Sequence, residues 1–138
     1  MNRDPFTVVV RIGLAIGGAI DAYVGVLALF APQLMQPLLD IPVKDANVAQ
    51  FAGGELVVAA LVYAVAFRDP VRFRALLWVC ALDQVFAVVL PWLALAHGAL
   101  PATWKIVAPI PLQALLAVLF VVYAARPGRN RSATPFMQ

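Results

Sequence analysis

The sequence predicts an all-α integral membrane protein, a bundle of four transmembrane helices with both ends of the chain on the cytoplasmic side. Three observations predict it: the apolar composition, four apolar runs of membrane-spanning length, and a one-sided distribution of basic residues. Hydrophobic residues make up 64% of the 138 residues and charged residues 12%, whereas soluble domains average roughly 45–50% and 25%. The surplus apolar surface therefore needs lipid as its solvent.

Four stretches are long enough to cross a bilayer, which takes about 20 mostly apolar residues. They lie at roughly 6–30, 48–67, 71–96 and 106–125. Residues 1–125 thus form one four-helix transmembrane domain, followed by a polar cytoplasmic tail at 126–138. The first stretch is too long for the core of a signal peptide, so we expect it to remain in the protein.

The basic residues predict the orientation. Eight of them lie on the side that would hold both termini and the central turn: Arg3, Arg11, Arg68, Arg72, Arg74, Arg126, Arg129 and Arg131. Only Lys44 and Lys105 lie on the opposite side. The positive-inside rule therefore predicts a multi-pass protein of the inner (plasma) membrane with both ends inside. Because these charges cluster at segment ends and form no continuous basic face, nucleic acid is excluded as a partner.

Helix boundaries and aromatic residues fit this layout. Asp4 and Asp69, each followed by a proline, predict the starts of the first and third helices. Asn47 with Gln50 predicts a capping box at the start of the second helix. The long connection at 31–46, which contains three prolines, is either a short amphipathic piece in the membrane interface or a proline-broken loop.

Aromatic residues predict the two levels of the membrane interface. Tryptophan and tyrosine are enriched where hydrocarbon meets the headgroups. Trp92 and Trp104 are expected at the outer interface, and Tyr63, Trp78 and Tyr123 at the inner one.

Each predicted span carries one informative polar residue: Asp21, Glu55, Asp83 and Gln113. A carboxylate near the bilayer centre costs at least about 2.5–3.5 kcal/mol, so such residues are expected to face the bundle interior or a wet cavity. At 1.5 Å of rise per residue, three of them lie at related depths in the outer half of the membrane, and Asp83 lies near the midplane. We expect the four to converge on one pocket open to the outer side.

Small residues and prolines support this convergence. Gly13, Gly17 and Gly25 share a helix face with Asp21, and such a stripe lets a neighbouring helix approach closely. Pro91 cannot donate to the carbonyl four residues before it, which leaves a free acceptor above Asp83. For one buried acid, interhelical hydrogen bonding is as good an explanation as function. Three acids at related depths favour function.

The sequence contains few residues that could bind a metal or a cofactor. One cysteine, Cys80, and one histidine, His97, are too few for a structural zinc site. No phosphate-binding or dinucleotide-binding glycine motif occurs, and no histidine lies within a span to hold haem. We therefore expect no metal and no cofactor.

Three short segments carry a resemblance to a known family. They are Leu38-Leu39-Asp40-Ile41-Pro42, Phe51-Ala52-Gly53-Gly54-Glu55 and Arg68-Asp69-Pro70. With these the chain resembles the DoxX-like group of small four-helix bacterial membrane proteins, which implies a four-helix bundle and little about activity. More distantly it is similar to the sterol-isomerase and sigma-2-receptor superfamily, which implies acids that hold amine or sterol ligands. The histidine and tryptophan constellation of the isomerase is not evident.

Three functions follow from the four polar residues. The first is a binding or accessory protein that holds a lipophilic or amine-bearing molecule with Asp21, Glu55, Asp83 and Gln113. The second is an acid–base enzyme, an isomerase or cyclase acting on a lipophilic substrate, with the three acids as catalytic groups. The third is a small proton-coupled cation exporter. We expect the lipid bilayer as a partner, and both a homo-oligomer and a larger membrane complex remain open.

Overall fold

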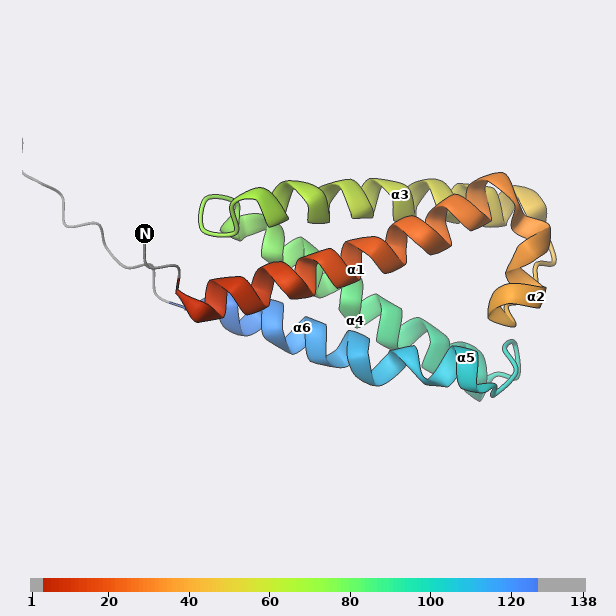
Figure 1. The fold of residues 1–138 in the computed structure, drawn as a ribbon. Helices are drawn as coiled ribbons and strands as arrows, with labels where there is room; N and C mark the ends of the chain where they lie inside the picture. Colours follow the sequence, from red (N-terminus) through yellow and green to blue (C-terminus); the bar gives the residue numbers. More distant parts are fainter. Residues whose placement is uncertain (1–3, 127–138) are drawn as a thin grey trace, which may run out of the picture.

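The protein is a bundle of long helices in the computed structural model, which describes residues 4–126 (Figure 1). Four spans are long and apolar enough to cross a membrane. They are α1 (Pro5–Phe30), α3 (Ala46–Arg68), α4 (Arg74–Ala96), and Trp104–Ala125, which consists of α5 (Trp104–Val107) and α6 (Pro109–Ala125). The predicted all-α bundle of four candidate membrane spans is confirmed. The predicted tail lies outside the described residues except for Arg126.

The connection between α1 and α3 contains two short helical pieces. The 3-10 turn η1 (Pro32–Leu34) leads directly into α2 (Met35–Leu39). Of the two forms expected for this segment, the structure thus contains the short helix. Met35 is buried, whereas Leu34 and Leu38 are exposed, so α2 presents one side to the bundle and the other outward.

Two of the three predicted helix starts need correction. Asp4 accepts a hydrogen bond from the amide two residues later at 3.3 Å, as expected for the cap of α1. The cap of α3 is Asp45, whose carboxylate accepts from the amide of Asn47 at 2.8 Å. Asp69 caps a separate turn, because its carboxylate accepts from amides two and three residues on, and α4 begins only at Arg74.

The helices associate in two pairs. α1 packs most extensively against α3, and α4 against α6. Figure 1 shows these pairs drawing apart toward the end of the bundle that carries α2 and α5. We call this the α2 end, and the opposite end, where α1 begins and α6 finishes, the terminal end.

Glycines set the close approach of α1 and α3. A Cβ atom on Gly53 would lie only 2.6 Å from the backbone nitrogen of Leu29 and 2.7 Å from the carbonyl oxygen of Gly25. The glycine stripe of α1 is indeed the packed face of the helix, since Gly13, Gly17 and Gly25 are buried. The predicted role of this stripe in helix packing is confirmed.

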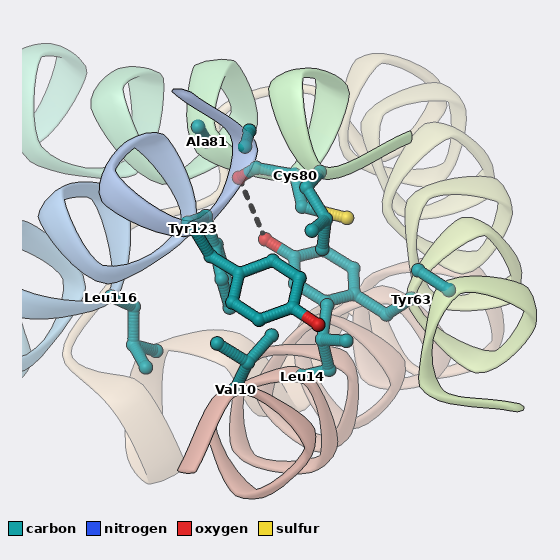
Figure 2. Close-up of a cluster of buried hydrophobic side chains, with 11 residues drawn as sticks. Val10, Leu14, Tyr63, Cys80, Ala81, Leu116 and Tyr123 are labelled. Carbon is teal, nitrogen blue, oxygen red and sulfur yellow. Dashed lines mark hydrogen bonds between the residues drawn. The ribbon is translucent and has the colours of Figure 1, made fainter. Parts of the chain in front are cut away.

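The apolar core lies toward the terminal end. Its buried members are Val10, Leu14, Tyr63, Ala66, Leu77, Cys80, Ala81, Leu116, Phe120, Tyr123 and Ala124, several of which Figure 2 labels. The rings of Tyr63 and Phe120 meet edge to face with centroids 5.9 Å apart. Tyr63 is thus a core residue, and its predicted place in an interfacial belt was wrong. The reason is a polar partner for its hydroxyl inside the bundle.

The outside of the bundle is apolar on every span. Large side chains from each of the four spans are more than half exposed, among them Ile12, Phe51, Leu82 and Leu115. A monomeric soluble protein rarely exposes apolar patches of this extent. Together with the length of the spans, this surface indicates contact with a lipid bilayer.

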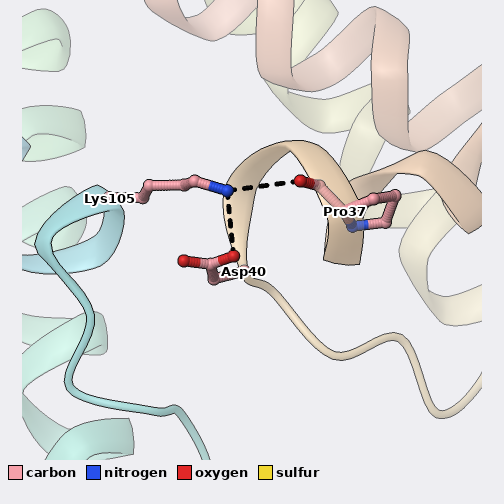
Figure 3. Close-up of polar contacts among 3 residues, drawn as sticks. All are labelled: Pro37, Asp40 and Lys105. Atoms are coloured by element: carbon pink, nitrogen blue, oxygen red, sulfur yellow. Dashed lines mark hydrogen bonds and ion pairs between the residues drawn. The ribbon is translucent and has the colours of Figure 1, made fainter.

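An ion pair fastens the α2 end. The ammonium of Lys105, in α5, donates to the carboxylate of Asp40 at 3.0 Å and to the carbonyl of Pro37 at 3.2 Å (Figure 3). Asp40 follows the last residue of α2 and has a left-handed backbone, with φ of 59°. Lys105 thus stabilises the carboxyl end of α2, where a cation is favourable, and joins it to the fourth span.

Candidate functional site

Asp21 is the buried acid of the bundle. Its side chain lies on the glycine face of α1 and is only 5% exposed. One carboxyl oxygen, Oδ2, is buried without a hydrogen-bond partner in the described residues. Such an atom is costly to leave unpaired in a low-dielectric interior. The predicted inward position of Asp21 is confirmed.

Asp83 lies beside Asp21. The two carboxyl groups, one from α1 and one from α4, are close enough for a direct side-chain interaction. Two neighbouring carboxylates repel each other when both are ionised. Asp83 is less deeply buried than Asp21 and keeps part of its surface accessible.

Tyr63 joins the third helix to this pair. Its hydroxyl lies 2.8 Å from Asp83 Oδ2 and 3.1 Å from the carbonyl oxygen of Cys80, and it donates its single proton to these two acceptors (Figure 2 shows the second contact). The Gln84 amide donates to the Tyr63 hydroxyl at 2.8 Å and to Asp83 Oδ2 at 3.3 Å. Asp21, Tyr63, Asp83 and Gln84 thus form one polar network across α1, α3 and α4.

Sequence reasoning did not find the role of Tyr63. A signal was present, however, in the two consecutive glycines 17 and 18. A Cβ atom on either would lie under 3 Å from the Tyr63 side chain, so these glycines make room for a ring from the facing helix. Two adjacent glycines one turn before an acid leave a gap in the surface of a helix. A tyrosine on the antiparallel helix that faces this gap indicates a polar contact nearby.

Glu55 does not join the network. It lies on the exposed face of α3, where it lines a shallow groove together with Gln50, Phe51, Gly54 and Val58. No hydrogen bond connects it to Asp21 or Asp83 within residues 4–126. Of the predicted acids, Asp21 and Asp83 therefore lie inside the bundle, whereas Glu55 faces outward.

Gln113 lies on the inward stripe of α6. It follows Ile110 by three residues and precedes Ala117 by four, and both of these are buried. Gln113 itself is only half-buried, and none of its contacts within the described residues is a hydrogen bond to the acids. It is placed to face the interior between the helix pairs, nearer the α2 end than the apolar core.

The carboxyl pair lies at a boundary in the interior. On its terminal side the core is sealed by buried residues such as Cys80 and Phe120. Toward the α2 end, Ala87 and Pro91, which share the face of Asp83, are only half-buried, and α4 has no buried residue beyond Gln84. The interior is therefore less tightly closed on the side of the acids that faces α2. Pro91 also leaves the Ala87 carbonyl without its helical donor.

A metal ion is not indicated by the arrangement. Among the described residues, no group of three histidine, cysteine or acidic side chains lies close enough to hold one. The chemistry available at the pair is that of carboxyl groups alone. They can hold a proton, accept hydrogen bonds and attract a cation.

Comparison with known proteins identifies no relative of this chain. No family model, no curated protein and no solved structure matches this chain. The fold and the site therefore indicate a multi-pass membrane protein with four candidate spans and a buried Asp21.

Proposed function

We propose that the protein binds a lipophilic amine, whose ammonium group is received by the Asp21–Asp83 pair. The observation that carries the proposal is the buried, unpartnered Oδ2 of Asp21 next to the partly accessible carboxyl of Asp83. Neither carboxyl has an ion-pair partner among the described residues. An ammonium group supplies both the missing donor and the missing positive charge.

The surroundings favour a charged donor over a neutral one. Charge-assisted hydrogen bonds are roughly twice as strong as neutral ones, and the low dielectric of the bundle reduces their screening. Tyr63 and Gln84 hold the Asp83 carboxyl in place by direct hydrogen bonds. The ligand therefore meets a fixed acceptor without having to order it first.

The apolar part of the ligand is proposed to lie toward the α2 end. There the half-buried Ala87 and Pro91 continue the face of Asp83, and Gln113 faces the interior from α6. The Ala87 carbonyl, freed by Pro91, offers a second acceptor. A molecule with an amine at one end and a hydrocarbon body matches this order of polar and apolar surface.

A second candidate, an acid–base enzyme, is favoured by the same two neighbouring carboxyl groups. One carboxyl of the pair can donate a proton while the other accepts one, as required for moving a double bond in a lipophilic substrate. The acid and base would be Asp21 and Asp83. Deuterium incorporation into the bound molecule, in protein exchanged into heavy water, tests this candidate. Binding without deuterium incorporation would support the binding protein and contradict the enzyme.

We further propose that both ends face the cytoplasm of the inner membrane, so that the α2 end faces outward. At the terminal end lie Arg11, Arg68, Arg72, Arg74 and Arg126, whereas Lys44 and Lys105 lie at the α2 end. This distribution matches the positive-inside rule. In intact cells a membrane-impermeant maleimide is expected to label Lys44→Cys and not Arg72→Cys. The reverse pattern would invert the orientation.

Native mass spectrometry of the protein purified in mild detergent tests the proposed function. A defined bound mass beyond lipid and detergent is expected for the natural chain. The double variant Asp21→Asn/Asp83→Asn keeps the shape of both side chains and removes their charge, so it is expected to lose this mass. Glu55→Gln is the matched control, because it removes a carboxyl outside the network, and it is expected to retain the mass. An adduct that is equal in all three proteins refutes the proposal, as does a chain that carries none.

A further inference from the structure

The outward face of α3 carries a regular repeat. Its residues recur at alternating steps of four and three positions, and five of the six are exposed, with Gly54 half-buried: Asn47, Phe51, Gly54, Val58, Leu61 and Val65. This is the spacing of the a and d positions of a heptad, by which two helices pack side by side. The opposite face of α3 is already used, since Gly53 lies against α1. We call the repeat the outer α3 seam.

The residues beside the seam include polar side chains, which lipid alone solvates poorly. Glu55 is nine residues from the start of α3, or about 13 Å along a helix of roughly 33 Å, and so lies near mid-span. A carboxyl group at that depth is costly when it faces hydrocarbon. Acyl chains contain no donor for it. Gln50, also exposed, flanks the other side of the seam.

We propose that two copies of the chain pair through the outer α3 seam, around a twofold axis normal to the membrane. Such an axis makes the two α3 helices parallel. In a parallel pair, the residue that precedes an a position faces the residue five places later on the other helix. Gln50 precedes Phe51 in the seam, and five places later is Glu55. Gln50 of each copy therefore faces Glu55 of the partner subunit.

The chemistry of this contact is self-complementary. The amide of Gln50 donates to the carboxyl of the partner subunit's Glu55, and the twofold axis forms the same contact a second time. Gly54 lies between them on the seam, and a Cβ atom added to it would meet nothing within 4 Å in the single chain. It leaves room for the two backbones to approach. A second copy thus supplies what Glu55 lacks, in the same membrane and at the same depth.

Cysteine cross-linking in native membranes tests the pairing. Val58→Cys places a thiol on the seam and is expected to give a covalent dimer, twice the 14.8 kDa chain, under mild oxidation. Leu82→Cys is the matched control, because Leu82 is similarly exposed on α4 and away from the seam. Cys80 is buried and stays in both proteins. Cross-linking of Leu82→Cys alone, or of neither variant, would overturn the proposal.

A bulky residue at the glycine provides a second test. Gly54→Leu fits the single chain, because the space around it is open, but it forces the two helices apart. We expect loss of energy transfer between labelled copies in liposomes, whereas Ala19→Leu, on the exposed face of α1, leaves the transfer unchanged. A transfer signal that survives Gly54→Leu would contradict the seam. This pairing does not depend on ligand binding at Asp21, so either proposal can fail without the other.

Discussion

At the scale of single residues, Tyr63 is the group on which the polar network depends. Its hydroxyl contacts Asp83, the Cys80 carbonyl and the Gln84 amide at 2.8–3.1 Å, and its side chain is almost wholly buried. Removing the hydroxyl would leave a buried donor and buried acceptors without their partner. The cost of such unpaired groups exceeds the net value of the hydrogen bonds themselves.

We predict that Tyr63→Phe destabilises the protein by about 1–3 kcal/mol, the desolvation penalty of buried groups that lose their partner. Denaturant unfolding in mild detergent, followed by circular dichroism, measures the change. Tyr23→Phe is the control, since Tyr23 is exposed and is expected to have little effect. Equal stabilities of the two variants would show that the network contributes nothing.

At the scale of elements, the contact of α1 with α3 is fixed by backbone proximity. The backbone atoms of Leu29 and Gly25 lie within 2.7 Å of where a Cβ on Gly53 would be. Backbone cannot swing aside as a long side chain can. The adjacent Gly54, by contrast, faces open space.

We predict that Gly53→Ala destabilises the protein by about 1–3 kcal/mol, the usual cost of overpacking. Gly54→Ala is the matched control and should stabilise the helix by roughly 0.5–1 kcal/mol, because alanine loses less backbone entropy than glycine. Unfolding is measured in excess detergent, with one chain per micelle. A neutral Gly53→Ala would show that the helices are not in close contact.

The tie between α2 and α5 is the element that responds to acid. The hydrogen bond from Lys105 holds the pKa of Asp40 below its ordinary value of 3.8. Because the folded pKa is the lower one, the stabilisation is fully present above pH 3.8 and is lost as the pH falls through the lowered value. α2 should therefore stay docked at neutral pH and loosen only in strong acid.

Hydrogen exchange of the α2 amides checks this assignment. We expect Asp40→Asn to exchange faster than the natural chain at neutral pH, and its α2 exchange to lose the acid-dependent step. Lys44→Gln, an exposed charge in the same connection, serves as the control and should leave α2 unchanged. An unchanged exchange rate in Asp40→Asn would mean that Lys105 does not hold α2.

At the scale of the whole molecule, the sequence predicted the number of spans and the burial of Asp21. Span length and apolar content suffice for the first, and the glycine face of α1 for the second. Glu55 was different, because α3 is apolar on both of its faces and hydrophobicity alone cannot tell lipid from bundle interior. The hydrogen bonds of Tyr63 depend on the register of α3 against α4, which no local pattern encodes.

The most direct test of the carboxyl pair is a titration with dodecylamine and with dodecanol, which share one hydrocarbon chain and differ in charge. Calorimetry in lipid nanodiscs should show saturable binding of the amine to the natural chain and to Glu55→Gln, with weaker binding of the alcohol. Asp21→Asn/Asp83→Asn should lose the preference. Equal binding of amine and alcohol, or an amine preference that survives the double substitution, would contradict a charge-holding pair at the centre of this protein.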